Sequence, residues 1–304
     1  MFKLPDKVKI VEVGPRDGLQ NEKSLLATED KLTYIKKLIG ANLQSIEVTS
    51  FVSPRSIPQM SDAEELFKKI QHEKKGNLEM PCLVPNLIGF KKALELGVSE
   101  IALFTATSNQ FTKKNINVTV EESFKQMDEI AVLARSNGIK IRGYISTAFG
   151  CPYQGEMSKS SLIEVVKKFE KYDLYELSIG DTIGVATPSQ VDDYLGDVVK
   201  HFDKSKIAMH FHDTRGMAIA NVLISLKQGI SIYDSSSGGL GGCPYAKGAT
   251  GNVATEDLIY LFNSLGIEHG VSEEKLIEAS IFILNKVKKE TPSKYLTTIL
   301  KTRS

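Results

Sequence analysis

The stretch Lys206-Ile207-Ala208-Met209-His210-Phe211-His212-Asp213-Thr214-Arg215-Gly216 joins a short apolar run to a dense group of polar side chains. The apolar part predicts a buried strand over 207–211. Side chains two positions apart in a strand point the same way, so His210 and His212 share one side of the strand end. Such a pair is either two ordinary packed histidines or half of a metal site, and the pattern alone leaves both open.

Apolar runs of the same kind recur along the chain and alternate with amphipathic segments. The predicted strands are 8–13, 45–49, 80–84, 100–104, 140–146, 174–179, 207–211 and an eighth that follows from 229–233. Strands that alternate with helices predict a parallel sheet. Eight such units favour a closed (β/α)8 TIM barrel, an α/β fold, over an open doubly wound sheet.

Capping patterns and helical periodicity place several helices between these strands. Ser61–Glu64 and Thr119–Glu122 both have the spacing of a capping box. A charged amphipathic helix is predicted from about 272 to 289. We therefore expect a single catalytic domain over 1–304, with the barrel at about 8–265 and a C-terminal helical extension at about 272–304.

The bulk composition excludes several classes of protein. The chain has 304 residues and a formal net charge of +1, from 38 basic and 37 acidic side chains, which does not suit a nucleic-acid binder. No apolar run approaches the length of a membrane span, and the N-terminus enters a strand without a signal or transit segment. Three cysteines fit a reducing compartment. We therefore expect a cytoplasmic protein without a membrane partner.

Polar residues gather where the predicted strands end, which is where TIM barrels carry their active sites. The residues that this register places on the rim are Arg16, Asp17, Gln20, Glu47, Ser50, Asn86, Thr105, Ser108, Arg142, Asp181, Thr182, His210, His212 and Asn252. Each of these residues has an ordinary structural explanation by itself. Their convergence on one rim favours a functional site.

Four of these residues form a plausible ligand set for a divalent metal ion. His210 and His212 supply two nitrogens, Asp17 supplies one oxygen, and Asn252 adds a neutral carbonyl oxygen. With one anionic ligand the ion keeps a net positive charge, which suits an oxygen-rich anionic substrate. Two imidazoles suit Zn, Co or Fe, whereas a mixed set with open positions also accepts Mg or Mn, so the ligand types leave the metal open.

Two cysteines lie in similar Gly-Cys-Pro-Tyr stretches, at 150–153 and 242–245, which follow the fifth and eighth predicted strands. Four of the five residues before Cys243 are glycines, so its thiol stands on a loop with little side-chain bulk. A thiol in such a place can exchange a proton with a substrate, although an inert buried cysteine is the default. The role of Cys151 stays undecided.

Three charged residues on the rim are candidates for acid–base or electrostatic roles. Glu47 points opposite to both of its apolar neighbours, toward the barrel mouth. Arg16 either stabilises a developing enolate or alkoxide oxygen, or forms a structural ion pair with Glu47. Asp181 is a candidate base.

Five stretches together resemble the 3-hydroxy-3-methylglutaryl-CoA lyases, and the similarity runs from about 8 to about 265. They are VEVGPRDGLQNE at 11–22, IEVTSFV at 46–52, LSIGDTIG at 177–184, HFHDTRG at 210–216 and GGLGGCPY at 238–245. The Gly-Leu-Gly-Gly-Cys-Pro signature is specific to these lyases. The Arg-Asp and His-x-His pieces are shared with the wider metal-dependent Claisen-type superfamily, which includes isopropylmalate and homocitrate synthases.

The resemblance implies a (β/α)8 barrel that binds one divalent ion, usually Mg or Mn, with no organic cofactor beyond the CoA of the substrate. The implied reaction cleaves 3-hydroxy-3-methylglutaryl-CoA into acetoacetate and acetyl-CoA. By position, Asp17, His210, His212 and Asn252 match the metal ligands. Arg16 matches the residue that stabilises the product enolate, and Cys243 matches the acid that protonates it.

Further residues are implied at the site with less detail. Glu47, Asp181 and Gln20 match positions that line it, with Glu47 and Asp181 among the catalytic candidates. Ser50, Arg142 and Thr182 join Arg16 and Gln20 as candidate substrate contacts. Lys113, Lys114 and Asn115 are candidates for contacts with CoA, although a solvated basic patch explains them more simply.

We expect a small-molecule acyl-CoA substrate, no nucleic-acid partner and a homodimer. The alternatives are a lyase for another 3-hydroxy-3-alkylglutaryl-CoA, a condensing acyl-CoA synthase of the same superfamily, and a catalytically silent barrel used as a binding scaffold. The synthases usually carry an additional C-terminal region, and the chain after the predicted barrel is short for one.

Overall fold

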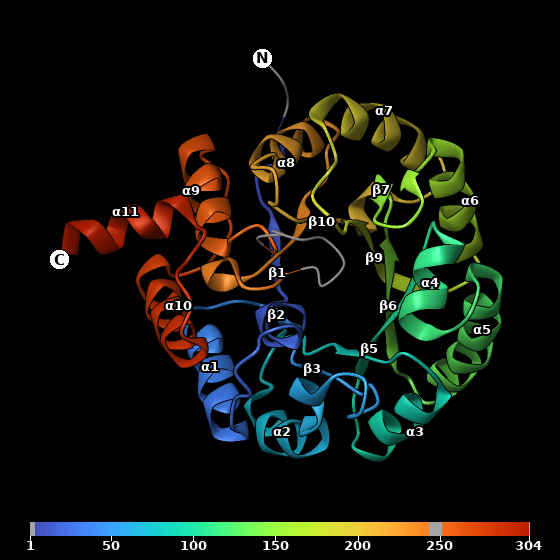
Figure 1. The fold of residues 1–304 in the computed structure, drawn as a ribbon, viewed down its shortest axis with the longest axis horizontal. Coiled ribbons are helices and arrows are strands. Elements are labelled where there is room, and N and C mark those ends of the chain that lie inside the picture. The colour runs from blue at the N-terminus through green and yellow to red at the C-terminus, as the bar shows by residue number, and fades with distance from the viewer. Residues whose placement is uncertain (1–3, 243–250, 304) are drawn as a thin grey trace.

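A parallel sheet closes on itself inside a ring of helices (Figure 1). The structure is a computed structural model that describes residues 4–242 and 251–303. Hydrogen-bonded neighbours run in the order β2-β1-β11-β10-β9-β6-β5-β4-β3. The short strands β2 (Ser45–Ile46) and β3 (Thr49–Ser50) belong to one expected strand, of which β2 pairs with β1 and β3 pairs with β4. The sheet therefore closes, and the predicted (β/α)8 barrel is confirmed.

The remaining strands lie where the apolar runs predicted them. They are β1 (Lys9–Glu12), β4 (Cys82–Leu83), β5 (Glu100–Ala106), β6 (Lys140–Ser146), β9 (Leu174–Asp181), β10 (Ile207–Phe211) and β11 (Ile232–Ser235). A small antiparallel hairpin, β7 (Gly150–Cys151) and β8 (Gly155–Glu156), follows β6.

Helices cover the outside of the sheet in chain order (Figure 1). They are α1 (Thr28–Gly40), α2 (Ala63–Ile70), α3 (Leu87–Glu95), α4 (Asn109–Ile116), α5 (Val120–Ser136), α6 (Lys159–Phe169), α7 (Pro188–Val198), α8 (Ala218–Lys227), α9 (Thr255–Leu265), α10 (Glu273–Val287) and α11 (Lys294–Arg303).

Of the two predicted capping boxes, one is confirmed and the other is wrong. Thr119 and Glu122 make both reciprocal bonds at the start of α5. At α2 the residue before the helix is Asp62, which makes no side-chain cap bond. Its carboxylate instead pairs with Lys31 at 2.7 Å and accepts a hydrogen bond from Thr28 at 2.9 Å. The helix therefore begins one residue later than the spacing predicts, and its N-cap residue contacts α1 instead of capping.

Three aromatic rings pack together on the side of the barrel where α5 and α6 lie. Phe169 is fully buried, and its ring centroid lies 5.1 Å from that of Phe124 and 5.9 Å from that of Tyr172. On the strand beneath, a Cβ at Gly143 would lie 2.9 Å from side-chain atoms of Leu174 and Leu177. A glycine in β6 therefore leaves room for these apolar side chains.

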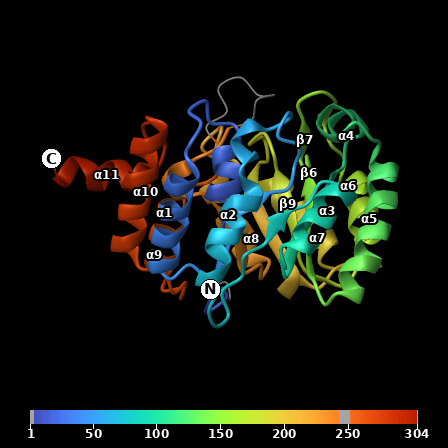
Figure 2. The ribbon, with the colours of Figure 1, turned by 90° about the horizontal axis from the view of Figure 1, so that it is seen from below.

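The C-terminal helices extend the barrel on one side. The expected helix near 272–289 is confirmed as α10, which packs against α1 and carries Lys286, 2.7 Å from Asp30. Helix α11 contacts α9 and then points away from the barrel (Figures 1 and 2). Within the described ranges, we find no helix with the length and apolar character of a membrane span.

The packing of these aromatic rings predicts the effect of truncating Phe169. Phe169→Ala should lower the free energy of unfolding by about 3–5 kcal/mol, because it leaves a cavity beside the rings of Phe124 and Tyr172. Urea unfolding followed by circular dichroism measures the change. Val132→Ala on α5, where the side chain is 67% exposed, is the control and should stay close to wild type. Equal stabilities for the two variants would contradict the packing argument.

Candidate active site

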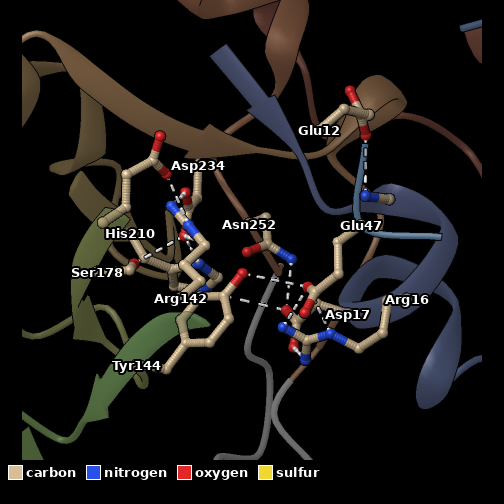
Figure 3. Close-up of polar contacts among 12 residues, drawn as sticks. Glu12, Arg16, Asp17, Glu47, Arg142, Tyr144, Ser178, His210, Asp234 and Asn252 are labelled. Carbon is tan, nitrogen blue, oxygen red and sulfur yellow. Dashed lines mark hydrogen bonds and ion pairs between the residues drawn. The ribbon is translucent and has the colours of Figure 1, made fainter. Parts of the chain in front are cut away.

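Three potential metal ligands from distant parts of the chain meet at the carboxyl ends of the strands, and Figure 3 shows two of them, Asp17 and His210. Asp17 lies in the helical turn η1 (Gly14–Gly18), which directly follows β1, and His210 and His212 lie at the end of β10. Their candidate ligand atoms all lie within 4.8 Å of one another. Asp17 Oδ2 is 4.0 Å from His210 Nε2 and 3.8 Å from His212 Nε2. The histidines that sequence left ambiguous therefore face a carboxylate.

Asn252 completes this group. Its Nδ2 donates to Asp17 Oδ2 at 2.8 Å and to the carbonyl of Leu240 at 3.2 Å. Its Oδ1 is buried and has no hydrogen-bond partner among the described residues. A buried acceptor without a partner is costly, and a cation would satisfy it. The donor set of two imidazoles, a carboxylate and an amide oxygen therefore fits a divalent metal ion.

A guanidinium stands beside this group and is held from three directions. Arg16 Nη1 donates to Asp17 Oδ1 at 2.7 Å, and Arg16 Nε donates to Glu47 Oε2 at 2.7 Å. The Tyr144 ring lies 5.5 Å from the guanidinium carbon, and its hydroxyl donates to Glu47 at 3.2 Å. The ion pair with Glu47 that was predicted for Arg16 is therefore present, and the guanidinium also contacts Asp17.

Burial and nearby charges shift the pKa values of Asp17 and Glu47 in opposite directions. Burial alone would raise the pKa of Asp17, but the Arg16 guanidinium and the two histidines lower it well below its usual range. For Glu47, burial outweighs the attraction of Arg16, and its pKa is raised. Asp17 therefore stays ionised and available as a ligand over the physiological pH range.

Beneath His210 lies a carboxylate that sequence reasoning missed. Asp234 on β11 is fully buried, and its Oδ2 lies 3.3 Å from His210 Nδ1. It also accepts bonds from Arg142 at 2.6 and 3.2 Å and from Ser178 at 2.7 Å. A carboxylate behind a ligating histidine orients the ring and sets its tautomer. The available signal was a carboxylate directly after the apolar pair Ile232-Tyr233, at the end of the eighth predicted strand.

Arg142, a predicted substrate contact, is paired with carboxylates in this structure. Its guanidinium is fully buried inside the barrel and is held by Glu176 at 2.8 Å as well as by Asp234. The guanidinium therefore supports the site through Asp234, and its role as a substrate contact stays a prediction.

Asp181 lies next to His212 but has other partners in this structure. Its two oxygens accept the backbone N–H groups of Val185 and Ala186, both at 2.9 Å. Burial raises its pKa. The carboxylate therefore holds the loop before α7, and its role as a base stays a prediction.

The other predicted site residues differ in burial and in their hydrogen-bond partners. Ser50 is buried at the end of β3, and its hydroxyl has no partner among the described residues. Thr182 Oγ1 accepts the N–H of Thr147 at 2.8 Å. Gln20 is half-buried just after η1. Cys243 lies outside the described residues.

The second cysteine and the basic residues of α4 lie apart from the metal ligands. The buried thiol of Cys151 donates to Ser108 at 3.0 Å in the hairpin after β6. Lys113 and Lys114 are exposed on α4, so the contact with CoA stays a prediction.

The carboxylate behind His210 predicts a matched pair of variants. Asp234→Asn should weaken Mn²⁺ binding by about 10- to 100-fold, because it removes the acceptor that orients the imidazole. Glu176→Gln is the control, since Glu176 also pairs with Arg142 but does not contact His210. Calorimetric titration of Mn²⁺ into each protein measures the difference. Equal losses in both variants would show that only the pairing of Arg142 matters.

Comparison with known proteins agrees with this geometry. The HMGL-like family model matches residues 7–283. The human mitochondrial hydroxymethylglutaryl-CoA lyase is 51% identical over 97% of this chain and 90% of its own length. The human cytoplasmic 3-hydroxy-3-methylglutaryl-CoA lyase is 50% identical over 96% of this chain and 78% of its own length.

The likeness extends to solved structures. The crystal structure of hydroxymethylglutaryl-CoA lyase from Pseudomonas aeruginosa is 43% identical, with a TM-score of 0.95, and the match covers 98% of this chain and 99% of that one. Both the sequence match and the structural match therefore cover almost the whole chain, which belongs to the HMGL-like family.

Proposed function

We propose that the protein is a carbon–carbon lyase that cleaves 3-hydroxy-3-methylglutaryl-CoA into acetoacetate and acetyl-CoA. The observation that carries this proposal is the group of Asp17, His210, His212 and Asn252 at the barrel mouth, with Arg16 beside it. Relatives of about 50% identity over nearly the whole chain bear the name of this lyase. The substrate class, an acyl-CoA, follows from the same names.

We assign the four mouth residues as ligands of one divalent ion, with Mg or Mn as the expected metals. The unpartnered Oδ1 of Asn252 and the imidazole nitrogens that face Asp17 support this assignment. When bound, such an ion acts as a Lewis acid toward substrate oxygens. The ligand types accept several divalent metals, so the choice between them belongs to experiment.

Arg16 is suited to stabilise the enolate that forms when the carbon–carbon bond breaks. A guanidinium has five N–H donors, and the contacts with Asp17 and Glu47 engage three nitrogens while leaving at least two hydrogens free. Glu47 and Tyr144 hold the group in place before substrate arrives, so little reorganisation is needed during the reaction.

The proton balance of the cleavage needs one base and one acid. A base removes the proton of the C3 hydroxyl, and Asp181 is the candidate beside His212. The bonding electrons move into the thioester as an enolate, and an acid then delivers a proton to its carbon. We assign that acid to Cys243, which directly follows the glycine run that ends at Gly242.

Three further expectations accompany this function as proposals. Residues 1–304 form one catalytic domain, supported by the packing of α10 against α1. The active unit is a homodimer. A cytoplasmic location is proposed, as for the relative named cytoplasmic. Another relative is named mitochondrial.

The assay follows directly from the reaction. Purified protein supplied with Mg²⁺ or Mn²⁺ should release acetoacetate from 3-hydroxy-3-methylglutaryl-CoA. Treatment with EDTA should abolish the release, and added metal should restore it. Absence of acetoacetate with either metal would refute the function. Activity that survives complete removal of metal would refute the ligand assignment alone, and substrates with other groups on C3 would define the side-chain preference.

The assigned acid can be tested with the second cysteine as its control. Cys243→Ala should lower kcat by about 10²–10⁴-fold with a small change in KM, because loss of a positioned acid slows proton transfer. Cys151→Ala should keep most of the activity, since that thiol is buried and bonded to Ser108. Steady-state kinetics of the two variants checks this, and a fully active Cys243→Ala enzyme would remove Cys243 from the mechanism.

A further inference from the structure

The segment from Gly238 to Gly242, here called the glycine stem, is held almost entirely by side chains from elsewhere. Gly238, Gly239 and Gly241 have positive φ values of 69°, 65° and 120°. Glycine has the largest conformational freedom of any residue, so a glycine run does not fix its own path. Whatever places this stem must therefore come from outside it.

The described carbonyl contacts of the stem all lead to side chains outside it. Gly238 O accepts from Thr291 Oγ1 at 3.0 Å, and Leu240 O accepts from Asn252 Nδ2 at 3.2 Å. Gly241 O accepts from Lys289 Nζ at 3.1 Å, and Gly242 O accepts from Asn21 Nδ2 at 3.0 Å. Two of these donors, Lys289 and Thr291, belong to the segment after α10.

The stem also lies against the residue that contributes the amide to the site. A Cβ at Gly251 would lie 2.6 Å from the backbone of Gly241, and a Cβ at Gly241 would lie 2.8 Å from Asn252 Nδ2. No side chain fits between these backbones. A shift of Gly241 is therefore transmitted to Asn252 and to its bond with Asp17.

Lys289 connects this stem to the segment that carries Asp17. Its Nζ also donates to Glu22 Oε1 at 2.8 Å, and the Glu22 side chain is only 12% exposed. Glu22 is held to the turn after Asp17 by its backbone bond to Leu19 at 2.9 Å. One ammonium thus joins the segment that carries Asp17 to the stem, which lies against Asn252.

We propose that Lys289 is a positioning residue that sets the spacing between Asp17 and Asn252 by joining Glu22 to the carbonyl of Gly241. The inference rests on the metal site of the proposed function and assigns a task to the C-terminal extension. Without the ammonium, Gly241 O loses its donor and Glu22 loses its cation in a partly buried place. The stem then moves away from η1 and loosens the ligand set.

The test compares Lys289→Met with Lys289→Arg and with Lys288→Met. Methionine keeps the length of the side chain but removes the donor, arginine restores the charge, and Lys288 is an exposed neighbour. Two readouts need no substrate: hydrogen–deuterium exchange of metal-free protein in peptides that contain 240–242, and the dissociation constant of Mn²⁺ by calorimetry. The values of kcat and KM are measured in parallel.

Lys289→Met should speed exchange in those peptides and weaken Mn²⁺ binding by about tenfold, as loss of a support for metal ligands does. Its kcat should fall more than its KM rises. Lys289→Arg should recover most of the loss, and Lys288→Met should match wild type. Unchanged exchange and unchanged Mn²⁺ affinity in Lys289→Met would overturn the inference, even if its melting temperature fell.

The outcomes also separate this inference from the proposed function. If wild type releases no acetoacetate but Lys289→Met still changes exchange and Mn²⁺ affinity, the function fails and the positioning role stands. If wild type is an active lyase and Lys289→Met is silent in both readouts, the function stands and the positioning role fails.

Discussion

The buried guanidinium of Arg142 is the interaction on which the site depends. It lies inside the barrel and binds carboxylates of two other strands, Glu176 on β9 and Asp234 on β11. A buried charge without its partner costs about 3–5 kcal/mol, so the three groups constrain one another strongly. Because Asp234 is fixed in this way, it presents an oxygen to His210 at a defined place. Asp234 thus sets the orientation of the His210 imidazole at the mouth of the barrel.

At the mouth of the barrel, one guanidinium is likewise paired with two carboxylates. Asp17 and Glu47 carry two negative charges when ionised, and Arg16 supplies one positive charge. A divalent cation on Asp17 and the two histidines would change the net charge of this group from negative to positive. That change favours an anionic substrate and a transition state in which negative charge develops on oxygen. The pairing of Arg16 with both carboxylates keeps the guanidinium in place with or without a bound cation.

Much of the fold, and the grouping of Asp17, His210 and His212, could be predicted because both depend on short-range patterns. Apolar runs placed the barrel strands, and the strand ends placed Asp17 and His210 on one rim. Two features that spacing along the chain did not reveal share a cause. Asp62 contacts α1 instead of capping α2, and Arg142 binds Glu176 and Asp234 inside the barrel. In both cases a partner far away in sequence decides which hydrogen bonds a side chain makes, and spacing along the chain carries no record of it.

The amino-acid sequence by itself determined the eight-fold alternation, the identity of the ligand types and the glycine run before Cys243, since periodicity and residue chemistry are local properties. Only the tertiary structure decided that Asp234 stands behind His210 and that Lys289 joins Glu22 to Gly241. The reason is physical: parallel strands and a C-terminal helix bring together side chains that are far apart in the chain. Their pairing energy depends on distance and burial, which exist only once the barrel has closed.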